Sequence, residues 1–319
     1  MGSEMCIRDR SEFPKLITSS VVRGSEKGQS RGGVYIVDFA SQTVEQYIDW
    51  NKSDIDFAGR GWDRGLRGIE FSDDLVWIAA SDELFAYDKN FQLVASYKNQ
   101  YLKHCHEISK RDNLLFLTST GYDSLLAFDL AARQFIWGIY VSKNGVHWVG
   151  QPFDPNTASG PPFANHYHLN NVHVDSTGVY FSGLQTNAIL FLDSKMQVTE
   201  FCTLPSGTHN ARPFLDGALF NDTAKNTVRY VTREGKQRAF DVIGFDNRDL
   251  TGTGLDDSKI ARQRFARGLC VINNRFIAGG SSPSTISIYD LAKGERLGSV
   301  NLTMDVRNAI HGLEVWPFK

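Results

Sequence analysis

The sequence predicts an all-β protein, a six-bladed β-propeller whose C-terminal strand completes the N-terminal blade. Three observations lead to this prediction. A short apolar strand that starts with a polar residue recurs six times, an aspartate-marked turn follows it at a nearly constant distance, and the last copy lies at the C-terminal end of the chain. Repeats of this kind, with four short strands in each, are typical of propeller blades.

The recurring strand is clearest in residues 308–315, Asn-Ala-Ile-His-Gly-Leu-Glu-Val, and it returns in residues 67–71 and 267–271. In the six aligned copies the third position is always apolar: Ile69, Ile108, Val172, Ala211, Leu269 and Leu313. The first position is always polar: Arg67, His106, Asn170, His209, Arg267 and His311. We therefore expect six innermost strands around a central channel, with a ring of polar side chains at one end.

The second landmark is an aromatic or aliphatic residue followed by aspartate, at Asp88, Asp129, Asp193 and Asp290. In three copies this aspartate lies 23 residues after the polar start, and in the first copy 21 residues after it. Aspartate favours tight turns because its side chain hydrogen-bonds nearby backbone amides. Short β-rich runs such as 75–80 and 276–280 lie between the landmarks, which completes four strands for each repeat.

The chain is expected to form one domain over residues 14–319, preceded by a non-native or disordered lead of residues 1–13. Residues 16–23, 33–40 and 43–50 predict the outer strands of a blade whose inner strand is 309–316. Two insertions, 142–168 and 246–263, join an outer strand to the next inner strand. We expect both to cover one end of the channel as lids, because long loops in compact domains are often functional.

Composition excludes several classes of function. With 34 basic and 36 acidic residues, the net charge of −2 favours neither nucleic acid nor an anionic membrane as a partner. No apolar run approaches the length of a membrane span. The four cysteines lack CxxC spacing, which suits a reducing compartment, so we expect a cytoplasmic protein whose native N-terminus could be missing. Nothing in the sequence indicates an oligomeric state.

Alternate copies of the strand start with histidine, and we call His106, His209 and His311 the ring histidines. Three converging imidazoles suit a divalent metal ion, zinc or iron, with a position left open for water or substrate. His104 is a possible fourth ligand. Carboxylates three residues after ring positions, Glu70 among them, could orient a ligating histidine.

Arginines beside such a metal favour a small anionic substrate, most simply one with a carboxylate. The predicted catalytic residues are Arg67, Arg267, His168 and Tyr167. The predicted substrate-binding residues are Asn170, Arg212 and Trp148. The function predicted from these residues is a metal-dependent lyase or hydrolase. The alternative is a non-catalytic propeller that binds a ligand or a protein, in which polar channel residues hold ordered water.

The blade layout resembles the six-bladed propellers of the NHL, gluconolactonase and strictosidine-synthase type. Residues 208–217, with the run Thr-His-Asn-Ala-Arg-Pro-Phe-Leu-Asp-Gly, and residues 265–269, Phe-Ala-Arg-Gly-Leu, look similar to an uncharacterised bacterial propeller family. The first resemblance implies a six-bladed fold that covers nearly the whole chain. The second gives no information about activity.

The ring histidines with a neighbouring arginine are similar in arrangement to peptidylglycine amidating lyase, a six-bladed propeller with histidine-bound zinc. This resemblance implies that the ring histidines are zinc ligands and that Arg67 or Arg267 binds the substrate, although the usual blade motifs of that enzyme are absent. Residues 310–315 also look like the last histidine segment of carotenoid cleavage oxygenases, longer seven-bladed enzymes with four-histidine iron. That likeness implies a non-haem iron oxygenase as a second alternative.

Overall fold

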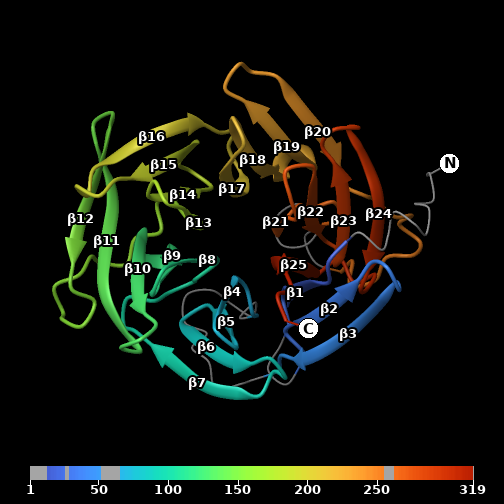
Figure 1. Cartoon of the computed structure of the whole chain (residues 1–319), viewed down its shortest axis with the longest axis horizontal. Coiled ribbons are helices and arrows are strands. Elements are labelled where there is room, and N and C mark those ends of the chain that lie inside the picture. The colour runs from blue at the N-terminus through green and yellow to red at the C-terminus, as the bar shows by residue number, and fades with distance from the viewer. Residues whose placement is uncertain (1–12, 26–28, 52–64, 255–261, 319) are drawn as a thin grey trace. The chain divides into compact units, whose positions relative to one another are not determined.

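The computed structural model describes residues 13–25, 29–51, 65–254 and 262–318. Within these ranges the strands form six sheets, and the fold is an all-β, six-bladed β-propeller, as the sequence predicts (Figure 1). Two single-turn 3-10 helices, η1 (Thr120–Tyr122) and η2 (Thr223–Lys225), are the only helices in the described part of the chain. No helix in that part is long and apolar enough to cross a membrane.

The chain divides into two compact units, which are described separately. One unit contains the residues up to Leu66 and from Leu215 onwards, and we call it the terminal unit. The other, the middle unit, is Arg67–Phe214.

The middle unit contains three complete blades and the first strand of a fourth. Its first sheet has the order β4 (Ile69–Ser72), β5 (Leu75–Ala80), β6 (Glu83–Asp88), β7 (Leu93–Lys98). The second has the order β12 (His147–Phe153), β11 (Gln134–Asn144), β10 (Ser124–Asp129), β9 (Leu114–Ser119), β8 (Ile108–Arg111). The third has the order β13 (Leu169–Val174), β14 (Val179–Gly183), β15 (Ala188–Leu192), β16 (Val198–Thr203). The unit ends with β17 (Thr208–Phe214).

The terminal unit contains the remaining strands. The sheet that begins with β17 continues with β18 (Gly217–Asp222), β19 (Thr227–Thr232) and β20 (Gln237–Asp241). The next has the order β21 (Leu269–Val271), β22 (Phe276–Ser281), β23 (Thr285–Asp290), β24 (Glu295–Asn301). The last has the order β25 (Asn308–Val315), β1 (Leu16–Val22), β2 (Gly33–Asp38), β3 (Thr43–Asp49).

The last sheet confirms the predicted closure of the N-terminal blade by the C-terminal strand. The strand β25 pairs antiparallel with β1, from Leu16 opposite Val315 to Val22 opposite Asn308 (Figure 1). This pairing gives β1 a hydrogen-bonded neighbour on both sides and leaves no open edge there.

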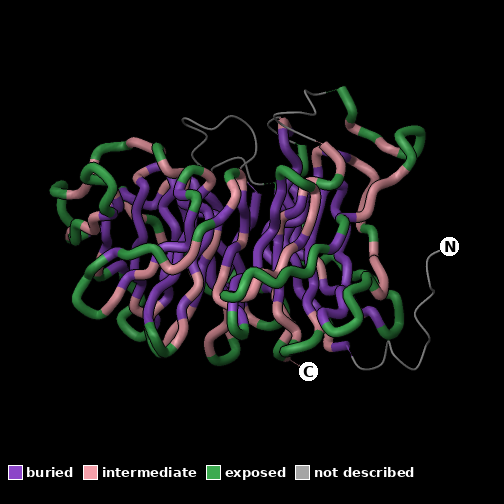
Figure 2. Tube along the Cα trace, turned by 90° about the horizontal axis from the view of Figure 1, so that it is seen from above, coloured by how far each residue is buried: buried purple, intermediate pink, exposed green. Residues whose placement is uncertain are grey.

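Burial follows the predicted pattern, with buried residues concentrated in the strands and exposed residues in the turns (Figure 2). The apolar third position of every repeat is buried. The aspartates form the expected turns: Asp88 Oδ1, for example, accepts hydrogen bonds from the backbone amides of Asn90 (2.9 Å) and Gln92 (2.8 Å). The equivalent aspartates that also accept from backbone amides are Asp38, Asp129, Asp193 and Asp290.

Phe13 is the last residue of the predicted lead 1–13 and the first residue that the structure describes. It is buried and packs edge-on against Phe276, with ring centroids 5.1 Å apart, in a core that includes Leu16 and Val37. An aromatic ring next to the first strand can remove apolar area from water there, which explains why it joins the core. Residues 1–12 lie outside the described residues.

The predicted lids contribute to the blades in different ways. In the segment 142–168, β11 extends to Asn144 and β12 runs antiparallel beside it, so part of this segment forms a fifth strand on its blade. The second segment, 246–263, is described only in part; its Thr251 forms a bridge with Asp305 in the terminal unit. Residues 255–261 lie outside the described residues, so the predicted lid role remains a prediction.

Candidate functional site

The polar residues that start each repeat are held where the chain enters an innermost strand. In the middle unit β4 contacts β8, β8 contacts β13, and β13 contacts β17. The starting residues of these strands are buried: Arg67, His106, Asn170 and His209.

The backbone turns in the same way before three of these starting residues. The residue two positions earlier has a left-handed conformation: His104 (φ 57°), His168 (φ 53°) and Gly207 (φ 78°). Glycine adopts this conformation readily, whereas each histidine does so at a cost of about 1 kcal/mol or more.

His106 lies at the centre of a small group of imidazoles in the middle unit. Its Nδ1 is 2.6 Å from the carbonyl oxygen of His104 and 2.9 Å from Thr120 Oγ1. Because a carbonyl oxygen only accepts hydrogen bonds, Nδ1 carries a proton, and in the neutral imidazole Nε2 then carries the lone pair. The ring of His168 lies edge-on to His106 at 5.2 Å between centroids. The structure thus brings together two predicted site residues from the starts of neighbouring blades.

Asp123 anchors the segment that carries His168 and Tyr167. Its carboxylate accepts hydrogen bonds from the backbone amides of three consecutive residues, 166–168. Tyr167 packs edge-on against Trp148 at 5.0 Å, and the Trp148 indole donates to Glu200 at 2.9 Å. Tyr167 and Trp148 therefore lie beside each other, and neither ring packs against a ring histidine in the described residues.

The terminal unit pairs two of the predicted site residues, Arg267 and His311. Arg267 Nη1 lies 3.0 Å from His311 Nε2 and 3.4 Å from its Nδ1, and the Arg267 guanidinium also lies over the ring of Phe265 at 5.1 Å. Arginine only donates, so the His311 ring accepts this hydrogen bond as a neutral imidazole. A metal ion bound at His311 Nε2 would have to displace Arg267.

The ring histidines are divided between the units: His106 and His209 belong to the middle unit and His311 to the terminal unit. Across the residues that the structure describes, no group of three or more His, Cys, Asp or Glu side chains is placed to hold a metal ion. The zinc or iron ion predicted from the sequence gains no support from this arrangement and stays a prediction.

A second set of polar side chains gathers on the innermost strands of the middle unit, and we call it the inner-strand cluster. Glu70 lies on β4, Glu107 directly precedes β8, and Lys110 lies on β8. The other members are His173 on β13 and Asn210 and Arg212 on β17. All six are half-buried. The cluster therefore combines residues from four consecutive innermost strands.

Hydrogen bonds link the members of the cluster across neighbouring strands. Asn210 Nδ2 donates to Glu107 Oε2 at 3.1 Å, which joins β17 to the start of β8. The backbone amide of Lys110 donates to Glu70 Oε1 at 3.3 Å, which joins β8 to β4. Gly68 permits this close approach, since a Cβ there would lie 2.7 Å from the amide nitrogen of Ile108 and 2.8 Å from Glu107 Oε1.

The protein environment changes the acidity of the titratable members. Burial raises the pKa of Glu107 from 4.5 to about 8, only partly offset by its hydrogen bonds and by Arg212. Burial also raises the pKa of Glu70. Burial, followed by the charge of Arg212, lowers the pKa of His173 from 6.5 to about 3. Solvent still reaches Glu107, so its high pKa reflects dense surrounding protein rather than complete isolation from water.

Arg212 acts electrostatically on several members of the cluster but forms no ion pair with them among the described residues. Its charge acts on Glu70, Glu107 and His173, yet it forms no ion pair with either carboxylate in the described part of the chain. Its Nε is buried and has no hydrogen-bond partner among those residues. A buried guanidinium donor without an acceptor is costly, so this atom favours an acceptor supplied from outside the chain.

The sequence identified Arg212 and Glu70 as candidates but missed Glu107, Lys110 and Asn210. The missed signal is the alternation of a β-strand, in which neighbours of a buried residue face the other side. Ile69, Ile108, Val172 and Ala211 are buried, and the residues on either side of each face the opposite side of the strand. This rule selects Glu70, Glu107, His173, Asn210 and Arg212 together, but not Lys110, which lies two residues after Ile108.

Comparison with known proteins supports the fold. No protein-family model and no curated protein matches the sequence. Among solved structures, the nidogen/laminin complex is similar with a TM-score of 0.56 and 9% identity, over 94% of this chain and 97% of that one. At this identity the likeness shows the β-propeller fold alone.

Two further structures have lower scores. Apo AztD from Citrobacter koseri has a TM-score of 0.47 and 11% identity, over 91% of this chain and 83% of that one. The structure of U3-55K has a TM-score of 0.49 and 10% identity over 76% of this chain, and the match spans 66% of that chain.

Proposed function

We propose that the protein binds a small carboxylate-bearing ligand at the inner-strand cluster. The observation that carries this proposal is Arg212, a half-buried arginine with no ion pair in the described residues and a buried Nε without an acceptor. A planar carboxylate can accept two parallel hydrogen bonds from a guanidinium, which makes it the natural acceptor for such a group.

The charge balance of the cluster supports the same ligand class. Near pH 7 Glu107 is mostly protonated and His173 is neutral, because their pKa values are about 8 and about 3. Lys110 and Arg212 are cations, and Glu70 supplies at most one negative charge. The cluster therefore carries at least one uncompensated positive charge, which an anionic ligand would neutralise.

Calorimetric titration with carboxylates such as succinate, glutarate and benzoate, each beside its uncharged amide, tests the proposal. We expect the acid to bind and the amide to bind at least about 10-fold more weakly, because the amide lacks the charge. Arg212→Ala should lower the affinity by on the order of 10- to 1,000-fold, and Arg212→Lys should restore it only in part.

Arg111→Ala is the matched control. Arg111 lies on β8 next to Lys110 and donates to the backbone oxygen of Asp175 at 3.2 Å instead of joining the cluster. Its replacement should leave carboxylate affinity unchanged. Equal binding of acids and amides, or equal losses in the two arginine variants, would contradict the proposal.

A second candidate function is acid–base catalysis on the bound ligand, and the pKa of Glu107 favours it. A carboxyl group with a pKa of about 8 is a proton donor near neutral pH, and Glu70 lies close enough to influence it electrostatically. Proton NMR of each bound carboxylate would detect conversion. If the protein is a catalyst of this kind, Glu107→Gln should keep the ligand affinity and lose turnover. If the ligand stays chemically unchanged over days, the protein binds the ligand without catalysis.

A further inference from the structure

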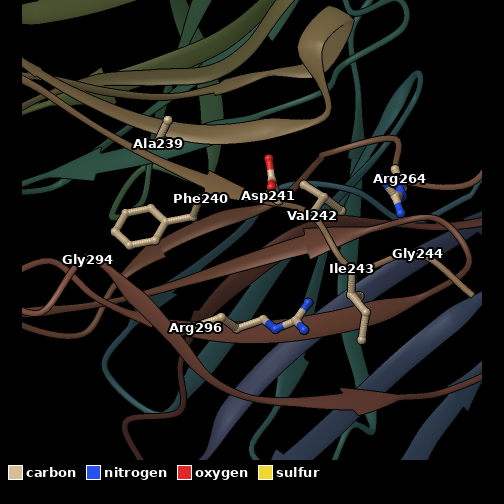
Figure 3. A pocket seen from close by; sticks show the side chains of 9 residues that line it. All are labelled: Ala239, Phe240, Asp241, Val242, Ile243, Gly244, Arg264, Gly294 and Arg296. Carbon is tan, nitrogen blue, oxygen red and sulfur yellow. The ribbon is translucent and has the colours of Figure 1, made fainter. Parts of the chain in front are cut away.

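A concave site lies in the terminal unit, and none of its lining residues belongs to the inner-strand cluster. It is a groove of about 530 Å³, within the range of ligand-binding pockets. Six consecutive residues, 239–244, form one side, and Arg264, Gly294 and Arg296 complete the lining (Figure 3). The groove thus runs along the end of β20 and past the start of β24.

The strand β20 offers an open edge to this groove. It is the last strand of its sheet and pairs with β19 on one side, from Thr227 opposite Asp241 to Val231 opposite Gln237. Backbone N–H and C=O groups on its other side have no neighbouring strand in the described structure. An open edge of this kind can accept an extended peptide as an additional strand.

The charges in the groove favour an acidic occupant. Within the described residues, neither Arg264 nor Arg296 forms an ion pair or donates a side-chain hydrogen bond. Figure 3 shows both side chains directed toward the segment 242–244, while the carboxylate of Asp241 points away from them. The two guanidinium groups therefore lie on the same groove, and no carboxylate among the described residues forms an ion pair with either of them.

Arg264 is held in place by the backbone. Its φ of 61° is left-handed, a conformation that non-glycine residues rarely adopt, and its amide donates to the oxygen of Ser282 at 2.7 Å. A Cβ on Gly244 would lie 2.2 Å from Arg264 Nε, so only glycine at position 244 permits this side-chain placement. The local structure thus fixes the Arg264 backbone, and Gly244 leaves the space that the guanidinium occupies beside the groove wall.

We propose that this groove binds an extended acidic segment of a partner protein, which pairs with the edge of β20 and places its carboxylates against Arg264 and Arg296. Backbone hydrogen bonds would provide affinity, and the two arginines would select for alternating acidic side chains. This proposal is independent of the ligand proposed for the inner-strand cluster, because the two sites share no residue.

Fluorescence anisotropy with a labelled hexapeptide of alternating Glu and Val tests the proposal. We expect this peptide to bind at least about 10-fold more tightly than a version with Lys in place of Glu, and than a version N-methylated at alternate amides, which cannot pair with a strand edge. The double variant R264E/R296E should abolish binding. R248E is the matched control, since Arg248 is exposed and hydrogen-bonds Asp246 outside the groove lining.

Gly244→Ala provides a test that leaves both arginines in the chain. It should weaken binding of the acidic peptide several-fold by displacing Arg264, and circular dichroism of each variant checks that the fold is retained. Equal binding of the Lys and Glu peptides, or unchanged binding in R264E/R296E, would overturn the proposal. A further result would also overturn the proposal. If free glutamate or inorganic phosphate fully displaces the peptide and the N-methylated peptide binds normally, the groove is a site for small anions.

Discussion

Replacing Glu107 by Gln should change how the stability of the protein depends on pH. Glutamine is neutral and nearly the same shape, and its amide oxygen can still accept the hydrogen bond from Asn210. The substitution therefore removes the ionisation of one group and keeps its local contact. Other titrating groups are common to both proteins, so their effects largely cancel in the difference between the two.

The magnitude follows from the pKa of Glu107, which is about 8 in the folded protein against an ordinary value of 4.5. Because the folded protein holds the proton more tightly than the unfolded chain, its stabilising effect is complete below pH 4.5 and is lost as pH rises toward 8. The slope is about 1.4 kcal/mol per pH unit, so the full loss is on the order of 5 kcal/mol. Solvent access to Glu107 makes this an upper value, and we expect at least about 2 kcal/mol.

His173 affects the stability of the protein at acidic pH. Its pKa is lowered from 6.5 to about 3, so its stabilising effect is complete above pH 6.5 and is lost as pH falls toward 3. Between pH 4.5 and 6.5 the two contributions have opposite slopes and cancel. The summed contribution of these two groups should therefore be level in that interval, and above it the contribution of Glu107 should lower stability.

Urea denaturation followed by tryptophan fluorescence, at half-unit steps from pH 5 to pH 9, measures this effect. The free energy of unfolding of Glu107→Gln minus that of the wild type should rise with pH up to about pH 8 and then remain constant. A difference that stays flat across this range would show that Glu107 titrates normally, and would remove the charge argument for an anionic ligand.

Two other predictions concern the loop of residues 166–168 and the ring histidines. Asp123→Ala leaves three backbone amides without their acceptor, so it should lower the free energy of unfolding by about 2–4 kcal/mol. Asp129→Ala, at an exposed turn, is the control and should lower it by about 1 kcal/mol. Equal losses of the two variants in urea denaturation would contradict the anchoring role of Asp123. If the ring histidines bind a metal, elemental analysis of protein purified without a histidine tag should find about one zinc or iron per chain, and replacing any one of them by Ala should remove it. Metal-free protein whose melting temperature ignores zinc, iron and chelator would count against that site.

Local patterns in the sequence were sufficient to predict the blades. Each recurring inner strand has an apolar third position that is buried, and each turn aspartate bonds amides only two to four residues away, as Asp88 does with Asn90 and Gln92. Such features depend on neighbours in the chain, so they can be read without knowledge of the fold. The pairing of β25 with β1 was also predictable, because the repeat at the C-terminus lacked outer strands of its own.

The inner-strand cluster depended on the tertiary structure. Asn210 reaches Glu107 across 103 residues of sequence, and Lys110 reaches Glu70 across 40. Burial in the folded protein raises the pKa of Glu107, and Arg212 forms no ion pair with either glutamate in the described residues although its charge acts on both. Alternation along a strand indicates which side chains share a face. The distances and burial that determine their chemistry arise only when the strands pack together.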